Sequence, residues 1–208
     1  MGADCIETAF GVARLVGIEP TADQRQCLRS FHGWLLGEAL SAGGIGPDEG
    51  HRLWDRHIAD SIAFGLAIPG AVDCLDIGTG VGLPGIPLAI LFPDTEFTLV
   101  DRSGRRCDLA QRAVRVLGLR NCVVRQQDIQ DVTSTFGAVV SRAAMPVGKI
   151  LIHVKRILRP GGVALLGLSR QGTEPDPLDL PAGLRATVVY ISSEVLDRGA
   201  NLLRIEAT

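Results

Sequence analysis

The stretch 75–91, LDIGTGVGLPGIPLAIL, decides the fold of this chain. It contains GVGLPG at 80–85, a literal G-x-G-x-x-G. A dinucleotide-binding fingerprint places its first glycine directly after a strand, where it makes the turn. Here the strand-like run VDCLD is followed by Ile77 and then Gly78, so the glycine cluster begins at Gly78. The register of a nicotinamide site therefore does not fit.

Counted from the end of the strand, the glycines recur every second residue, at Gly78, Gly80 and Gly82, and Asp76 precedes them. This D-x-G-x-G-x-G arrangement resembles that of class I S-adenosylmethionine (AdoMet) methyltransferases. Alternate glycines let the backbone bend under a ligand without Cβ collisions, and AdoMet has no phosphate that needs a helix N-terminus. We expect Asp76 to order the loop and to face the amino acid end of the cofactor. The alternative is a tight turn without a ligand.

Two further acidic residues follow predicted strands. Asp101 ends the run EFTLVD, and ligands of open α/β sheets bind beyond the carboxyl ends of the strands. A carboxylate at this place can accept hydrogen bonds from both ribose hydroxyls, and it can also cap the helix that follows. Asp128 ends the stretch NCVVRQQD, just past the third predicted strand, and the resemblance to class I methyltransferases implies that it meets the adenine amino group.

The hydrophobic pattern divides the chain at about residue 67. Apolar residues at helical spacing predict three helices before it, near 6–16, from the N-cap Thr21 to about 40, and near 48–66. After it, short aliphatic runs alternate with helical ones, which is typical of βαβ units. Strands are expected near 72–76, 96–100, 122–126, 137–141 and 162–167, and helices near 84–92, 105–117 and 147–158.

Two last strand-like runs, LRATVVYISS and NLLRIEA, are close enough in sequence to form an antiparallel pair. The prediction is an α/β fold of the class I AdoMet-dependent methyltransferase type, Rossmann-like and doubly wound. Its sheet has seven mostly parallel strands and a reversed edge strand. Residues 1–67 form an N-terminal helical extension packed on the core, and residues 68–208 form the AdoMet-binding methyltransferase domain.

Composition gives weaker indications. The 208 residues carry a formal charge of −2, so nothing global indicates a nucleic-acid partner, although a local basic patch remains open. The five cysteines are odd in number and never spaced C-x-x-C, which suggests neither a disulfide framework nor a zinc site. The sequence shows no signal peptide and no apolar run long enough to span a membrane. We expect a soluble, cytoplasmic protein with no metal and no membrane partner.

Four stretches together point to one family: LWDRHIADS, DIGTGVGLPGIPLAI, the turn DRSGRR at 101–106, and VVSRA at 139–143. They resemble the glucose-inhibited division protein B family, bacterial methyltransferases of a guanine N7 in small-subunit ribosomal RNA. The form GPDEGHRLWDRH looks most like the actinobacterial branch. The resemblance covers roughly residues 40–170 and implies AdoMet as cofactor and small ribosomal subunit RNA as partner.

The resemblance also implies the site residues. The cofactor-binding set, with Arg102 and Asp128 added, is Asp76, Gly78, Thr79, Gly80, Gly82, Leu83, Asp101, Arg102, Asp128 and Arg142. Arg142 would lie near both cofactor and substrate, and the catalytic candidates are Arg142, His57 and Asp60. His57, Asp60 and Ser61 belong to the family's helix motif, which would border the same cleft. A packed histidine at position 57 and a purely structural arginine at position 142 are the alternatives.

If the acceptor is guanine N7, no general base is required, because that nitrogen has a free lone pair and loses no proton. Arg142 would stack on the guanine or donate to it. Five arginines are candidates for phosphate contacts: Arg52, Arg56, Arg102, Arg105 and Arg106.

Some positions depart from the family pattern. Leu168-Ser169 stands where the family commonly has Lys-Gly, with Arg170 one step later, and the last strand pair carries Asn201 and Glu206 rather than basic residues. Fewer cations than an RNA enzyme would use therefore flank the cleft. This favours, as an alternative, a small-molecule methyltransferase or methyltransferase-like cyclase of secondary metabolism, with His57 or Asp60 as its base. A catalytically idle AdoMet-binding or ribosome-binding module is a third hypothesis.

Overall fold

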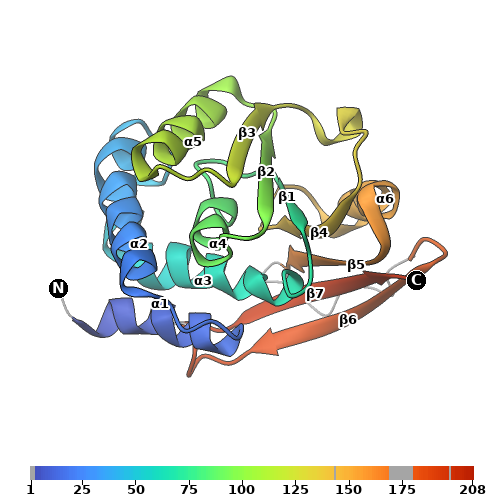
Figure 1. Ribbon diagram of the computed structural model, residues 1–208, viewed down its shortest axis with the longest axis horizontal. Coiled ribbons are helices and arrows are strands. Elements are labelled where there is room, and N and C mark those ends of the chain that lie inside the picture. The colour runs from blue at the N-terminus through green and yellow to red at the C-terminus, as the bar shows by residue number, and fades with distance from the viewer. Residues whose placement is uncertain (1–2, 143, 169–179, 197) are drawn as a thin grey trace.

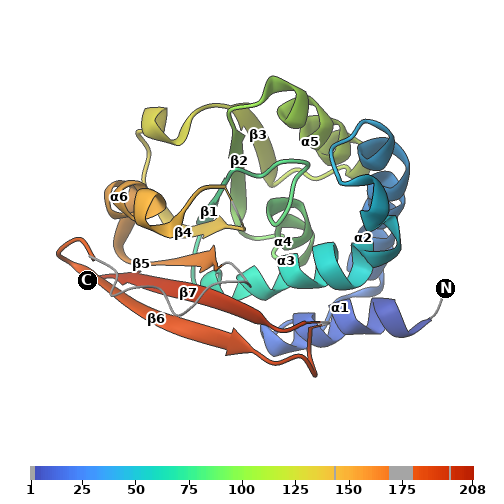
Figure 2. The ribbon, with the colours of Figure 1, turned by 180° about the vertical axis from the view of Figure 1, so that it is seen from behind.

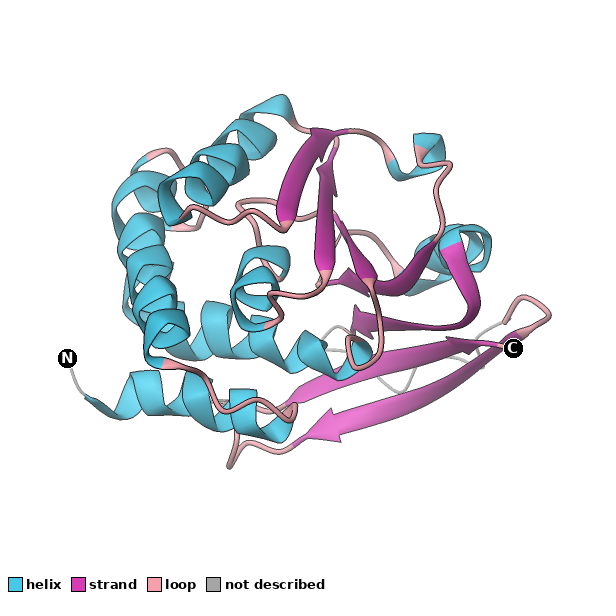
Figure 3. Cartoon of the chain, in the orientation of Figure 1, coloured by secondary structure: helices cyan, strands magenta, loops and turns pink. Residues whose placement is uncertain are grey.

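The computed structural model of the chain describes residues 3–142, 144–168, 180–196 and 198–208, so Ser169 and Arg170 lie outside the described residues. One sheet has the strand order β3-β2-β1-β4-β5-β7-β6 (Figures 1 and 3). Its strands are β1 Asp73–Ile77, β2 Glu96–Asp101, β3 Cys122–Gln126, β4 Phe136–Ser141, β5 Leu158–Gly167, β6 Leu184–Ile191 and β7 Ala200–Ala207.

The first five strands are parallel, and β7 runs antiparallel to both of its neighbours, β5 and β6. The predicted doubly wound sheet is confirmed. The structure adds that the reversed strand, β7, lies one place in from the edge and that β6 forms the edge. The helices are α1 Ala3–Leu15, α2 Ala22–Trp34, α3 Asp60–Ile62, α4 Gly85–Leu91, α5 Gly104–Leu117 and α6 Val147–Ile157.

Alternation along the strands divides the hydrophobic core between the two faces of the sheet. Cys74 and Leu99 belong to the cluster that α1, α2, α4 and α5 cover, whereas Leu75 and Val100 belong to the cluster that α6 covers. Figures 1 and 2 show this separation, with α2 and α6 on opposite sides of the molecule. The N-terminal helices thus share one core with the sheet.

The predicted N-cap Thr21 starts α2 as part of a complete capping box. Thr21 Oγ1 accepts from the Gln24 N–H at 3.2 Å, and Gln24 Oε1 accepts from the Thr21 N–H at 2.9 Å. Gln24 Nε2 also donates to the carbonyls of Ile90 and Leu91, which end α4 and have no partner within that helix. The Gln24 side chain therefore helps to cap α2 and also joins α2 to α4, the helix that follows the glycine loop.

The prediction of one regular helix near 48–66 is wrong. The segment is a succession of short pieces: a 3₁₀-helix Pro47–Arg52, a π-helix Leu53–Ala59, the three residues of α3, and a 3₁₀-helix Ala63–Ala67. Leu53, Ile58 and Ala59 are buried, while His57 of the same π-helical turn lines a cavity. Wide π turns occur frequently at functional sites, and here one lets a single turn serve both the core and the cavity.

Candidate functional site

The site lies where the strand order reverses between β1 and β4, at the carboxyl ends of the strands. Two cavities of about 410 Å³ and 260 Å³ open there, and Gly78 and Arg106 line both. The first is also lined by Ile77, Val100, Asp101, Arg102, Gln127, Asp128, Ile129, Ala144, Met145, Pro146 and Lys149. The second is also lined by Gly44, Ile45, Gly46, His57, Thr79, Gly80, Val81, Leu83 and Arg142.

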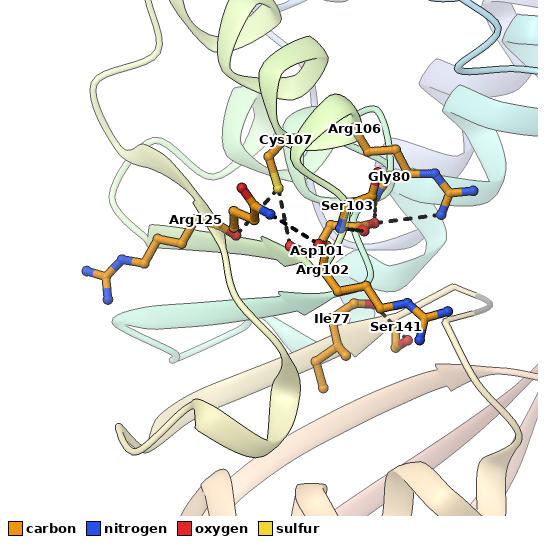
Figure 4. Close-up of polar contacts among 10 residues, drawn as sticks. Ile77, Gly80, Asp101, Arg102, Ser103, Arg106, Cys107, Arg125 and Ser141 are labelled. Carbon is orange, nitrogen blue, oxygen red and sulfur yellow. Dashed lines mark hydrogen bonds and ion pairs between the residues drawn. The ribbon is translucent and has the colours of Figure 1, made fainter.

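The glycine loop is tied to the strand ends beneath it. The N–H groups of Gly78 and Thr79 both donate to the carbonyl of Val100, at 2.8 and 3.0 Å. Ser141 Oγ at the end of β4 donates to the carbonyl of Ile77 at 3.0 Å, a pair that Figure 4 places beside Asp101. The ends of β1, β2 and β4 therefore form one rigid floor for the cavities.

Positive φ angles explain why the loop needs alternate glycines. Gly78, Gly80 and Gly82 have φ angles of +69°, +60° and +100°, which L side chains rarely adopt. A Cβ on Gly82 would lie 2.2 Å from Ile86 Cδ1, so this glycine serves helix packing and lines neither cavity. The other two glycines, Gly78 and Gly80, line the second cavity.

We predict that Gly78→Ala destabilises the protein more than Gly80→Ala. Both substitutions meet the same backbone cost of roughly 1–2 kcal/mol for a left-handed residue. A Cβ on Gly78 would in addition lie 2.3 Å from the Ala144 Cβ, whereas nothing lies within 4 Å of one on Gly80. Urea unfolding of the two variants measures the difference, and equal free energies of unfolding would contradict the prediction.

Asp101 is an acidic residue of the first cavity and is only 5% exposed. Its Oδ2 accepts from the Gly80 N–H at 3.0 Å and its Oδ1 from the Ser103 N–H at 2.9 Å, as Figure 4 shows. Arg106 lies 3.9 Å from Oδ2. A carboxylate oxygen has two lone pairs, so each oxygen keeps one for a ligand. Asp101 orders the turn before α5 and does not cap the helix, whose N-cap is Ser103. This contact is compatible with the ligand-binding role expected for Asp101.

Asp76 lies beneath the loop, fully buried, and lines neither cavity. Its Oδ2 accepts from the Gly85 N–H at 2.8 Å, which joins the glycine loop to α4. Burial raises the pKa of Asp76 to about 7, against the opposing effects of the Thr79 hydroxyl and the Gly85 N–H. Asp76 Oδ1 and Thr79 Oγ1 are nevertheless buried with no hydrogen bond of ordinary geometry to any described residue. These two unsatisfied oxygens lie in and beneath the glycine loop, which is shaped for a ligand.

Asp128 borders the first cavity and also orders its own segment. Its Oδ1 accepts from the Gln130 N–H at 3.1 Å and so begins a short 3₁₀-helix, Ile129–Asp131. Arg156 of α6 donates to the carbonyls of Ile129, at 2.8 Å, and Val132. The wall that carries Asp128 is therefore held against α6 by a guanidinium, a contact that the sequence pattern did not indicate.

His57 and Arg142 meet at the second cavity. His57 Nδ1 lies 3.4 and 3.5 Å from the terminal nitrogens of Arg142, and His57 Nε2 lies 3.0 Å from Glu49 Oε2. A guanidinium only donates, so Nδ1 accepts and Nε2 carries the proton that it donates to Glu49. Burial, followed by the charge of Arg142, lowers the pKa of His57, although Glu49 opposes this shift. The imidazole is therefore neutral at pH 7 and links Glu49 to Arg142.

The other two residues of the helix motif lie farther from the cavities. The Asp60 carboxylate is near enough to raise the pKa of Arg142, against the larger lowering by burial, but Asp60 lines neither cavity. The Ser61 hydroxyl is buried and donates to the carbonyl of His57 at 2.5 Å. Sequence reasoning missed Glu49, although its spacing of eight residues from His57 would place it two helical turns away.

Part of the N-terminal extension reaches the site. The segment Gly44-Ile45-Gly46 lines the second cavity, and a Cβ on Gly44 would lie 2.5 Å from Val81 Cγ1. Arg105 of α5 donates to the carbonyl of Ala42 and holds this segment over the glycine loop. Residues 42–46 therefore shape the site as well as covering the sheet.

Solved structures share the fold of this chain. An N-methyltransferase, NodS from Bradyrhizobium japonicum, is 20% identical, with a TM-score of 0.52 over 66% of this chain and 86% of its own. An AdoMet-dependent methyltransferase from Aquifex aeolicus is 16% identical, with a TM-score of 0.50 over 66% and 82%. Together with the strand order and the glycine loop, these likenesses give the chain the class I AdoMet-dependent methyltransferase fold.

The particular family follows from the sequence comparisons. Residues 24–171 match the model of the GidB family, described as rRNA small subunit methyltransferase G, and the chain belongs to that family. Ribosomal RNA small subunit methyltransferase G of Acidothermus cellulolyticus is 40% identical over 64% of this chain, and that of Frankia casuarinae 37% over 63%. The matches span only 60% and 52% of these two relatives. The homologue from Mycobacterium sp. (strain KMS) is 33% identical over 89% of this chain and 84% of its own.

These relatives confirm the resemblance to the actinobacterial branch. Within the described ranges, no helix is long and apolar enough to cross a membrane. The same residues contain no group of three or more His, Cys, Asp or Glu side chains placed to hold a metal ion.

Proposed function

We propose that this protein binds AdoMet in the joined cavities and transfers its methyl group to guanine N7 of small-subunit ribosomal RNA. The adenosine would occupy the first cavity, with Asp101 on the ribose hydroxyls and Asp128 near the adenine. The methionine end would pass over Gly78 and Gly80 into the second cavity. Two observations support the fit of the site to AdoMet. Asp101 keeps free lone pairs, and the oxygens of Thr79 in the loop and of Asp76 beneath it are unsatisfied.

One observation supports the choice of substrate above the others. Arg142 lines the second cavity beside the neutral His57, whose Nδ1 lone pair is engaged by Arg142 and whose Nε2 proton is donated to Glu49, so His57 offers no free base. Among the described residues, no carboxylate lines that cavity. A small-molecule substrate that must lose a proton would need a base there, whereas guanine N7 needs a donor or a stacking partner. The family match does not favour the small-molecule alternative either. A ribosomal RNA substrate would place the protein in the cytoplasm.

The residues of this chain would act by orientation. Bound AdoMet supplies an electrophilic methyl group on a sulfonium sulfur. Asp101 and the glycine loop would fix the cofactor, and the Arg142 guanidinium would hold the guanine so that N7 lies in line with the carbon–sulfur bond. Good orientation of two reactants supplies roughly 7–11 kcal/mol of barrier reduction. The guanine would gain the methyl group and the positive charge at N7, S-adenosylhomocysteine would leave, and no proton needs to be removed.

The buried Asp76 makes AdoMet affinity depend on pH. Its pKa of about 7 means that half of the free protein carries a neutral Asp76 at that pH. The cationic cofactor prefers the ionised carboxylate, so binding lowers this pKa and releases a proton. Affinity is therefore expected to rise with pH by up to about tenfold per unit between pH 5 and 7, and to level off above 7. Calorimetric titration at five pH values measures this dependence.

Two controls separate Asp76 from other groups. Asp76→Asn should bind AdoMet with an affinity that changes little over the same pH range. S-adenosylhomocysteine, which lacks the sulfonium charge, should show a shallower dependence than AdoMet with the unsubstituted protein. An equally steep slope for Asp76→Asn would show that another group titrates.

The proposed function is tested by incubating the protein with tritiated AdoMet and small ribosomal subunits from a bacterium that lacks its own enzyme of this family. Label is expected in the RNA, in proportion to the subunits added. Asp101→Ala protein supplies the background. Tight AdoMet binding with no label in RNA would overturn the rRNA assignment while leaving the cofactor assignment in place.

A further inference from the structure

Positive charge is concentrated in one part of this mildly acidic chain. Residues 102–125 contain seven arginines and one acidic residue, Asp108, a formal charge of +6. The whole chain has −2, so the other residues together carry −8. Such segregation is unlike the mixed signs of an ordinary solvated surface. The basic residues that the last strand pair lacks are thus supplied here.

Helix α5 presents most of this charge outward. Its buried side consists of Cys107, Leu109, Ala110 and Ala113, which pack on the sheet. Arg105, Arg112 and Arg115 are spaced seven and three residues apart, so they lie on one side of the helix over about 15 Å. Figures 1 and 2 show α5 along the outside of the molecule, next to β3. Arg120 follows in the chain just after the helix ends at Leu117.

The outer arginines have no internal role in the described structure. Within residues 3–142, 144–168, 180–196 and 198–208, Arg112, Arg115 and Arg120 are exposed and make no hydrogen bond or ion pair. By contrast, Arg14 and Arg159 pair with carboxylates. Favourable charge at a helix C-terminus accounts for Arg115 alone. We call Arg112, Arg115 and Arg120 the α5 arginine surface.

Helix α5 begins at the mouth of the site, and the α5 arginine surface lies farther along, toward and beyond the C-terminal end of the helix. Arg102 and Arg106, from the first turn of α5 and the residues before it, line the first cavity. A polyanion that enters the cavities from this side would therefore run along α5. Arginine is suited to this role because its planar fork binds phosphate in two-pronged fashion.

We propose that the α5 arginine surface binds the phosphate backbone of the RNA that flanks the methylated nucleotide. The proposal rests on the proposed function and assigns the docking direction. Phosphate contacts position the RNA without reading its sequence, so each arginine contributes affinity and salt dependence. The chemistry of the methyl transfer does not involve these three side chains.

The test compares the unsubstituted protein with the triple variant Arg112→Gln, Arg115→Gln and Arg120→Gln. The variant should keep its melting temperature and its Kd for AdoMet, while its KM for small ribosomal subunits rises about tenfold or more. The slope of log Kd against log salt concentration for an RNA fragment of the substrate region should become shallower by about 3, roughly one per arginine. Arg185→Gln, an exposed arginine on the β6 edge, should change neither quantity.

The outcomes separate this proposal from the proposed function. An unchanged KM and an unchanged salt slope in the triple variant would overturn the docking role, even if the unsubstituted protein methylates ribosomal RNA. A shallower salt slope, in a protein that transfers no methyl group to ribosomal RNA, would support the surface as an RNA-binding face and overturn the substrate assignment instead.

Discussion

Asp101→Ala is expected to raise the Kd for AdoMet about 100-fold or more, because a hydrogen bond to a charged group contributes about 1.5–3 kcal/mol and two ribose contacts would be lost. The substitution also frees the Gly80 N–H, which Oδ2 now holds at 3.0 Å. Isothermal titration with AdoMet and with S-adenosylhomocysteine measures the loss. Both ligands carry the ribose, so both should weaken similarly.

Two further variants keep this prediction specific. Asp101→Asn retains the shape and the acceptor for the Ser103 N–H, so it should fold normally and still lose most of the affinity. Asp108→Ala removes an exposed carboxylate from the next turn and should leave the Kd unchanged. An unchanged Kd in Asp101→Ala would remove Asp101 from the ribose site.

Arg142→Ala is expected to lower kcat for ribosomal RNA about 100-fold or more while the Kd for AdoMet changes less than about threefold. Loss of a preorganised donor at a reacting centre typically costs 10²–10³ in kcat. Single-turnover transfer to small ribosomal subunits measures the chemical step, and calorimetry measures the cofactor. Arg142→Lys keeps the charge without the planar fork, so it should recover only part of the rate.

The opposite pattern would reassign this residue. If Arg142→Ala raised the Kd for AdoMet more than it lowered kcat, the guanidinium would be holding the methionine end of the cofactor. Arg185→Ala, on exposed β6, serves as the matched control. A melting temperature close to that of the unsubstituted protein shows that the partly buried Arg142 is not needed for folding.

Local patterns in the sequence were enough to predict most of the core fold. Aliphatic runs of four to six residues located β1 to β5 within a few residues, and Thr21 marked the start of α2. These features depend on neighbours in sequence, which a pattern records directly. The doubly wound class of the sheet followed from the glycine spacing, whereas the order of the strands comes from the structure.

Other features depend on contacts between distant segments, and no sequence pattern records them. Glu49 and the segment 44–46 reach the site only because the N-terminal extension folds over the glycine loop. The irregular turns at 47–67 arise because His57 must face the cavity while Leu53 and Ile58 stay in the core. Arg156 reaches across from α6 to the wall that carries Asp128.

The predicted site residues divide into two groups by position. Those that line the joined cavities are Gly78, Thr79, Gly80, Leu83, Asp101, Arg102, Asp128, His57 and Arg142. Asp76, Gly82 and Asp60 lie behind them, where the first two shape the glycine loop and the third faces Arg142. Glycine spacing and the family resemblance together identified both groups, but neither distinguished a residue that lines a cavity from one that supports it.

We propose that the cavity delivers a methyl group to guanine N7. This proposal is tested most directly by digesting the tritium-labelled RNA of small ribosomal subunits to nucleosides and separating them by chromatography. We predict that the label elutes with 7-methylguanosine and that Arg142→Ala reduces it. Label in a ribose-methylated nucleoside, in a methylated base other than 7-methylguanine, or in no nucleoside at all would contradict the account.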